Sequence, residues 1–168
     1  MIFVYIVSGI LMLLSIIIQG HPSFDVIRIA GVKPDLLFIV AIYLSYSFGS
    51  FYGETCAFIG GLFQDAISNS PLGLLALPKV IICFIVGMIG RDRFTSNATV
   101  IVVTLLLFIA SLLKGLITLF LCYVFREGSI SQVISVILPE AFYNALLSPI
   151  LFMLFDRIFA RELNLEGM

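Results

Sequence analysis

The chain has 168 residues, of which 61% are hydrophobic and only 11% are charged, and its mean hydropathy is +1.21. A soluble domain is closer to half apolar and a quarter charged, so this composition excludes an ordinary soluble domain and predicts a membrane protein. The net charge of −1, without a basic run, gives no basis for nucleic-acid binding.

Apolar segments account for almost the whole chain, and each crossing of the hydrocarbon core needs about 20 apolar residues. We expect helices over residues 2–19, 34–48, 53–67, 71–90, 97–125 and 133–160. The sequence therefore predicts an all-α membrane protein, a bundle of about six transmembrane helices. It leaves no room for a soluble domain, so residues 1–168 are expected to form a single transmembrane helical domain in the lipid bilayer.

The first helix has the length of a signal peptide but lacks a basic start and a small-residue cleavage site. We therefore interpret residues 2–19 as a transmembrane helix. Residues 22–33 are too short and too polar to span the membrane, and should lie at the interface or form a loop. Pro34 suits the first position of the second helix, where Asp35 meets the positive end of the helix dipole.

The third helix is the least hydrophobic of the six. Its polar residues are Glu54, Gln64 and Asp65. Gly53, Ala57 and Gly61 recur at a spacing of four, which lets neighbouring helices pack closely. An arrangement of five crossings, with this segment re-entrant, is the alternative to six.

The remaining helices have clear boundary signals. Ser70 is expected to cap the fourth helix, with Pro71 at its first position. Pro139 and Pro149 should kink the sixth helix. The tail, residues 161–168, is short and polar.

Lysines and arginines in short loops set the orientation of a membrane protein. With six crossings and the N-terminus inside, the inner basic residues are Arg91, Arg93, Arg157 and Arg161. The outer ones are Arg28, Lys33 and Arg126. The excess of basic residues on the inner side favours an orientation with both termini in the cytoplasm.

No residue pattern points to catalysis, a cofactor or a metal. Cys56, Cys83 and Cys122 lie inside apolar runs and are interpreted as buried hydrophobes. His21 is the only histidine and lies in a loop. Nucleophile, phosphate-loop and zinc-protease motifs are absent, so we predict that the protein is not an enzyme.

Several ionisable residues fall inside the apolar helices, where charge is costly and needs a partner. At about 1.5 Å per residue, Lys79 and Glu140 lie roughly 10 Å from the outer helix ends, and Lys114 and Asn144 roughly 16 Å. Two lysines would thus face two carboxylates, Asp65 and Glu140, in one leaflet. We expect a polar cluster of Lys79, Lys114, Glu140 and Asn144, with Gln64 as a further partner. It either fixes helix register or forms a pocket for a small polar ligand or a proton path, and we favour the first.

Three features resemble the MreD family of bacterial rod shape-determining membrane proteins. These are Pro34-Asp35-Leu36-Leu37, the run Gly60-Gly61-Leu62-Phe63-Gln64-Asp65 followed by Ser70-Pro71-Leu72-Gly73-Leu74, and the size with six predicted crossings. The middle run is the most specific. The motif residues that the resemblance singles out are Pro34, Asp35, Gly60, Gly61, Asp65, Pro71, Leu72 and Gly73.

The resemblance implies a non-catalytic scaffold in the bacterial inner membrane. Such proteins associate with MreC, act alongside MreB and the RodA and penicillin-binding transpeptidase machinery, and help direct peptidoglycan synthesis. It also implies a fold similar to the substrate-binding subunits of energy-coupling-factor transporters. Lys79 and Lys114 match no position of the family pattern.

The rival hypothesis is a solute-binding subunit of a vitamin transporter of that type. Lys79, Lys114, Glu140 and Asn144 would then line the ligand site. Against it, Ser8, Gly9 and Ser15 of the first helix are not four apart, and the chain has no tryptophan to stack on a vitamin ring. An intramembrane protease is a remote third hypothesis, because Asp35 and Asp65 match no protease motif.

Overall fold

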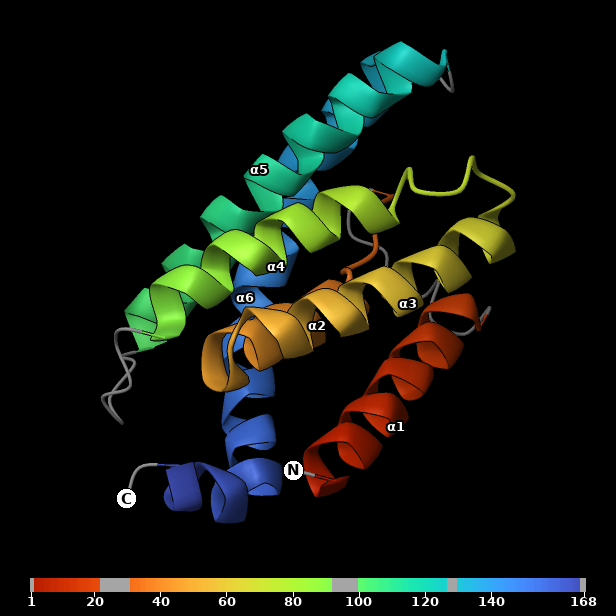
Figure 1. Ribbon diagram of the computed structural model, residues 1–168. Helices are drawn as coiled ribbons and strands as arrows, with labels where there is room; N and C mark the ends of the chain where they lie inside the picture. Colours follow the sequence, from red (N-terminus) through yellow and green to blue (C-terminus); the bar gives the residue numbers. More distant parts are fainter. Residues whose placement is uncertain (1, 22–30, 92–99, 127–129, 167–168) are drawn as a thin grey trace.

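The computed structural model describes residues 2–21, 31–91, 100–126 and 130–166. Within these ranges the chain is helical and contains no β-strand (Figure 1). The helices are α1 (Ile2–Gly20), α2 (Leu36–Phe48), α3 (Ser50–Ser68), α4 (Ala76–Arg91), α5 (Val100–Phe125) and α6 (Ile130–Glu166). The predicted all-α fold is therefore confirmed.

Helix α2 is the centre of the molecule. Its residues from Leu37 to Leu44 are all buried, because the segment is apolar on every side and has no face suited to water. Helices α1, α3 and α4 pack against it, and the second half of α6 crosses it. The core is therefore built around a short helix of 13 residues.

Small residues bring α2, α3 and α4 close together. A Cβ atom on Gly53 would collide with Ser45 of α2, and one on Gly61 would collide with the backbone of Ala76 at the start of α4. Gly87 of α4 lies equally close to the backbone of Ser50. The small-residue spacing of the third helix thus serves packing inside the bundle.

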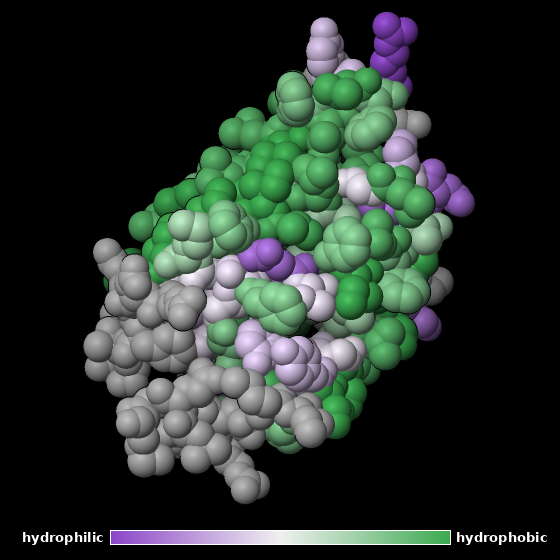
Figure 2. Space-filling view, viewed as in Figure 1, coloured by the Kyte–Doolittle hydropathy of each residue, from purple (hydrophilic) through white to green (hydrophobic). Residues whose placement is uncertain are grey.

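The exterior has the character of a membrane protein. Figure 2 shows one face covered mostly by apolar side chains, with hydrophilic groups at the tip and in a small central area. The segments long and apolar enough to cross a membrane are Phe3–Gly20, Val100–Phe125 and Val133–Ala160. Helices α2 and α4 are apolar but shorter, and α3 is less apolar. The number of crossings therefore stays a prediction.

Helices α5 and α6 form an antiparallel hairpin that projects past the other four helices (Figure 1). Helix α6 follows α5 over its first half and then continues past α2 with a change of direction. Pro139 and Pro149 lie inside α6, where each removes a backbone hydrogen bond. The start of α1 and the end of α6 lie at the same end of the bundle.

Two predicted boundaries were wrong. Helix α4 begins at Ala76 rather than Pro71, because residues 71–75 form a turn in which Gly73 has a φ of +98°. Helix α6 runs on to Glu166, because Arg, Glu and Leu, which make up most of the polar tail, are good helix formers. Of residues 22–33, where we expected an interfacial segment or a loop, residues 22–30 lie outside the described ranges.

Candidate functional site

Asp35 occupies the N-cap of α2. Its carboxylate accepts a hydrogen bond from Phe38 N at 3.1 Å, which satisfies one of the open donors at the helix start. Pro34, which has no N–H to satisfy, precedes it. The Asp35 backbone N–H donates to Asn144 Oδ1 of α6 at 2.8 Å. The cap is therefore held from both the backbone and the side chain.

The Asp35 carboxylate also lies between two lysines from different helices. Lys79 Nζ of α4 and Lys114 Nζ of α5 are each 2.9 Å from Asp35 Oδ2. Lys114 also pairs with Glu140 of α6, and Lys79 also donates to Gln64 of α3. Two cations are thus matched by two carboxylates.

Burial makes this arrangement interdependent. The side chain of Lys79 is 2% exposed and that of Lys114 is 9% exposed, whereas Glu140 is 17% exposed. A charge left without its partner in such a place costs several kcal/mol, on the order of 3–5. The two lysines and two carboxylates therefore stabilise the fold only as a set.

Further polar contacts extend the cluster to every helix. Gln64 Nε2 lies 2.6 Å from the side-chain amide of Gln19 of α1, and Asn144 Nδ2 donates to Ser111 Oγ of α5 at 3.1 Å. Lys114 Nζ also lies 4.9 Å from the centre of the Phe38 ring, a cation–π distance. We call this set the polar network: Gln19, Asp35, Gln64, Lys79, Ser111, Lys114, Glu140 and Asn144.

The polar network lies at one end of α1 to α4 but midway along the α5–α6 hairpin. Gln19 and Gln64 are near the last residues of α1 and α3, while Asp35 and Lys79 are at or near the first of α2 and α4. Lys114 lies in the middle of α5. The hairpin tip therefore extends beyond the level of the polar network.

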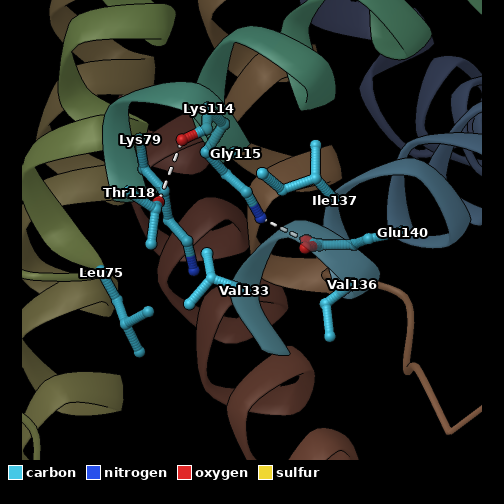
Figure 3. A pocket seen from close by; sticks show the side chains of 9 residues that line it. All are labelled: Leu75, Lys79, Lys114, Gly115, Thr118, Val133, Val136, Ile137 and Glu140. Atoms are coloured by element: carbon cyan, nitrogen blue, oxygen red, sulfur yellow. Dashed lines mark hydrogen bonds and ion pairs between the residues drawn. The ribbon is translucent and has the colours of Figure 1, made fainter. Parts of the chain in front are cut away.

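A cavity of about 290 Å³ borders the polar network between α4, α5 and α6 (Figure 3). Its lining is Leu75, Lys79, Lys114, Gly115, Thr118, Val133, Val136, Ile137 and Glu140. Figure 3 shows the Lys114 ammonium directed toward Glu140 and the Lys79 ammonium toward Val133. Most of the residues in the wall are apolar, and its charged members are Lys79, Lys114 and Glu140.

Asp65 forms a second, separate polar site at the turn between α3 and α4. Its carboxylate is fully buried and accepts from Gly73 N and Leu75 N, both at 2.8 Å, and from Ser70 Oγ at 3.1 Å. Ala76 N also lies within 3.4 Å of it. Asp65 thus satisfies the open N–H groups at the start of α4, a role that Ser70 was expected to fill.

The family model for rod shape-determining protein MreD matches residues 1–162. The chain belongs to the MreD family. No curated protein matches it significantly, nor does any solved structure, so the expected likeness to energy-coupling-factor subunits stays a prediction. As an MreD-family membrane protein, the chain has a role in determining rod shape.

The MreD motif residues fall into two places. Pro34 and Asp35 open α2 at the polar network, whereas Asp65 lies near the end of α3 and binds Gly73 of the α3–α4 turn. Gly60 and Gly61 pack on Leu37 and Ala76, between these places. Pro71 and Leu72 belong to the turn, and Leu72 is 71% exposed. The partner role of these residues remains a proposal.

The predicted lysines, Glu140 and Asn144 do lie together, but the second carboxylate was assigned wrongly. We expected Asp65 to face the lysines, and it caps the α3–α4 turn instead. Asp35 takes its place between Lys79 and Lys114. The predicted order of the helices contained a signal for this pairing. The second and fourth helices start at the same side of the bundle, so Asp35 and Lys79 come to one level.

Proposed function

We propose that this MreD-family chain is a non-catalytic scaffold of the bacterial inner membrane. It binds an MreC-like membrane protein and, with MreB and the RodA and penicillin-binding transpeptidase machinery, helps direct peptidoglycan synthesis. The family match over residues 1–162 is the observation that carries the proposal. On this reading both termini lie in the cytoplasm and the polar network lies toward the outer face.

The chemistry of the buried groups supports a structural role. Asp35 is occupied by Lys79, Lys114 and a helix cap, and Asp65 is occupied by backbone N–H groups. A general base needs a carboxylate with access to a substrate proton. These carboxylates are instead committed to holding helices together.

We assign the partner contact to the outer face of α3 and the α3–α4 turn. Apolar side chains are exposed along both, including Phe63 at 53% and Leu72 at 71%. The turn is fixed in place by Asp65, so Leu72 projects from a rigid support. Apolar anchors on a rigid support are typical of the residues that carry binding energy in an interface.

The test is purification of the tagged protein from its own host, with mass spectrometry of the retained proteins. We expect an MreC-like single-span protein and cell-wall synthesis enzymes, and we expect the F63A/L72A variant to lose them. The matched control is L146A/I150A, which removes equally exposed apolar side chains from α6. Equal retention by the two double variants would contradict the assigned surface, and absence of any such partner from the unaltered protein would contradict the function.

The vitamin-transporter alternative is favoured by one observation, the cavity beside Lys79, Lys114 and Glu140. Asn144, the fourth predicted ligand residue, is engaged by Asp35 N and Ser111 instead. The same purification separates the two functions. Recovery of an ATPase pair with a membrane coupling subunit, or of a bound vitamin-like molecule, would favour transport over scaffolding.

A further inference from the structure

The cavity between α4, α5 and α6 combines an apolar wall with two buried ammonium groups. An ammonium has three N–H donors. Among the described residues, Lys79 uses Asp35 and Gln64 as acceptors, and Lys114 uses Asp35 and Glu140. Lys114 thus contacts two acceptor atoms, which leaves one N–H for a ligand, whereas Lys79 contacts three, the two Asp35 oxygens and Gln64 Oε1. We propose that this cavity binds the anionic head group of a membrane lipid.

The level of the cavity suits a head group. Helix α1 has 19 residues, which at 1.5 Å per residue gives roughly 28 Å, close to the thickness of the hydrocarbon core. Its end at Gln19 lies against Gln64, a member of the polar network. Measured along α1, the network and the cavity beside it therefore lie at one boundary of the hydrocarbon core, and the α5–α6 tip continues beyond this level.

The shape of the cavity also suits a lipid. Val136 lines the cavity and is 39% exposed, so the cavity opens at the outside of the protein. The wall around the lysines consists of aliphatic side chains such as Leu75 and Ile137. A ligand must therefore bring apolar groups together with its charge, which a soluble anion does not.

The charge distribution shows how an anion could enter a site that is neutral overall. Asp35 is shared by both lysines, so these three groups carry one positive charge. Glu140 balances it from the cavity lining and is the most exposed of the four. A phosphate can therefore replace Glu140 as a partner of Lys114 without disturbing Asp35.

This exchange predicts opposite effects for two variants. E140Q removes the competing carboxylate, so the affinity for an anionic lipid should rise about threefold or more. K114Q removes a buried donor, so the affinity should fall at least about tenfold. V136F places a ring in the cavity mouth and keeps all four charges, so it should also lose at least about tenfold if the lipid enters there.

The experiment is native mass spectrometry of the full chain in detergent, titrated with dioctanoyl phosphatidylglycerol or dioctanoyl phosphatidylcholine. We expect one tightly bound phosphatidylglycerol and weaker binding of phosphatidylcholine. R126Q is the control, because Arg126 is an exposed cation that does not line the cavity, and its affinity should stay within about twofold of the unaltered protein.

Any of the following outcomes would overturn the proposal. The first is equal binding of the two lipids, which would mean that the charge of the head group does not contribute to binding. The second is a fall in affinity for folded E140Q, or unchanged binding by V136F, which keeps all four charges and therefore tests the site even if E140Q and K114Q fail to fold. The third is binding of glycerol phosphate as tight as that of the lipid, which would make the site one for a soluble anion. None of these outcomes depends on the recovery of an MreC-like partner.

Discussion

At the scale of single residues, Asp35 has two roles at once, as a helix cap and as a counter-ion. It caps α2 through Phe38 N and is the counter-ion of both Lys79 and Lys114. The capping function can be kept by serine, which is equally favoured at an N-cap but carries no charge. Substitution by serine therefore separates the charge of Asp35 from its cap.

We predict that D35S is strongly destabilising, by about 3–5 kcal/mol, because it leaves two buried ammonium groups with one carboxylate. The double variant D35S/K79Q should be more stable than D35S, because it restores one cation to one anion, Lys114 with Glu140. The measurement is the thermal unfolding midpoint in detergent. The single variant K79Q is the reference for this comparison. If K79Q lowered the stability of D35S as much as it lowers that of the unaltered protein, Asp35 and Lys79 would act independently. The polar network would then not stabilise the fold as a set.

At the scale of elements, the connection between α3 and α4 depends on one carboxylate. Asp65 accepts from Gly73 N, Leu75 N and Ser70 Oγ, all within 3.1 Å. Gly73, with its φ of +98°, cannot be helical, so α4 cannot start at Pro71. Asp65 replaces the side-chain cap that the turn itself does not provide.

D65N should destabilise the protein by about 2–4 kcal/mol, because an amide has one acceptor oxygen and would turn N–H donors toward the backbone donors of the turn. The matched control is E54Q on the same helix, where Glu54 is only partly buried and should change stability by less than about 0.5 kcal/mol. Circular dichroism melts in detergent would measure both. Equal midpoints for the two variants would show that the turn does not depend on Asp65.

The sequence predicted the helices better than it predicted their partners. The apolar runs predicted the first residue of five of the six helices to within three residues. The exception is α4, which begins at Ala76 rather than Pro71. Asp65, eleven residues before Ala76, accepts hydrogen bonds from the N–H groups at this helix start. Depth along each helix placed Lys114 and Glu140 correctly. It could not show that Asp65 faces the turn while Asp35 faces the lysines, since that depends on the rotation of each helix and on which helices are neighbours.

At the scale of the whole molecule, the α5–α6 hairpin is joined to the α1–α4 group at two separate levels. The polar network joins them at one end of α2. At the other end, the Tyr43 ring packs on Phe152 and Phe155, with ring centres 5.0 and 5.1 Å apart, and its hydroxyl donates to Asp156 at 2.9 Å. The projecting tip lies beyond the polar network, so its position depends on that network more than on the aromatic contacts.

Loss of the polar network should therefore loosen the hairpin tip without releasing its base. Spin labels on Leu72 of the turn and Phe120 of α5, both well exposed, report the distance between the α1–α4 group and the tip, once the three buried cysteines are replaced by alanine. We expect a narrow distance distribution in this background and a broader one in D35S/K79Q, which removes the links of Asp35 and Lys79 but leaves Lys114 paired with Glu140. D156N, which alters the hydrogen bond at the opposite end, should keep the narrow distribution. An unchanged distribution in D35S/K79Q would mean that apolar packing alone positions the hairpin, and the polar network would then have no part in the shape of the molecule.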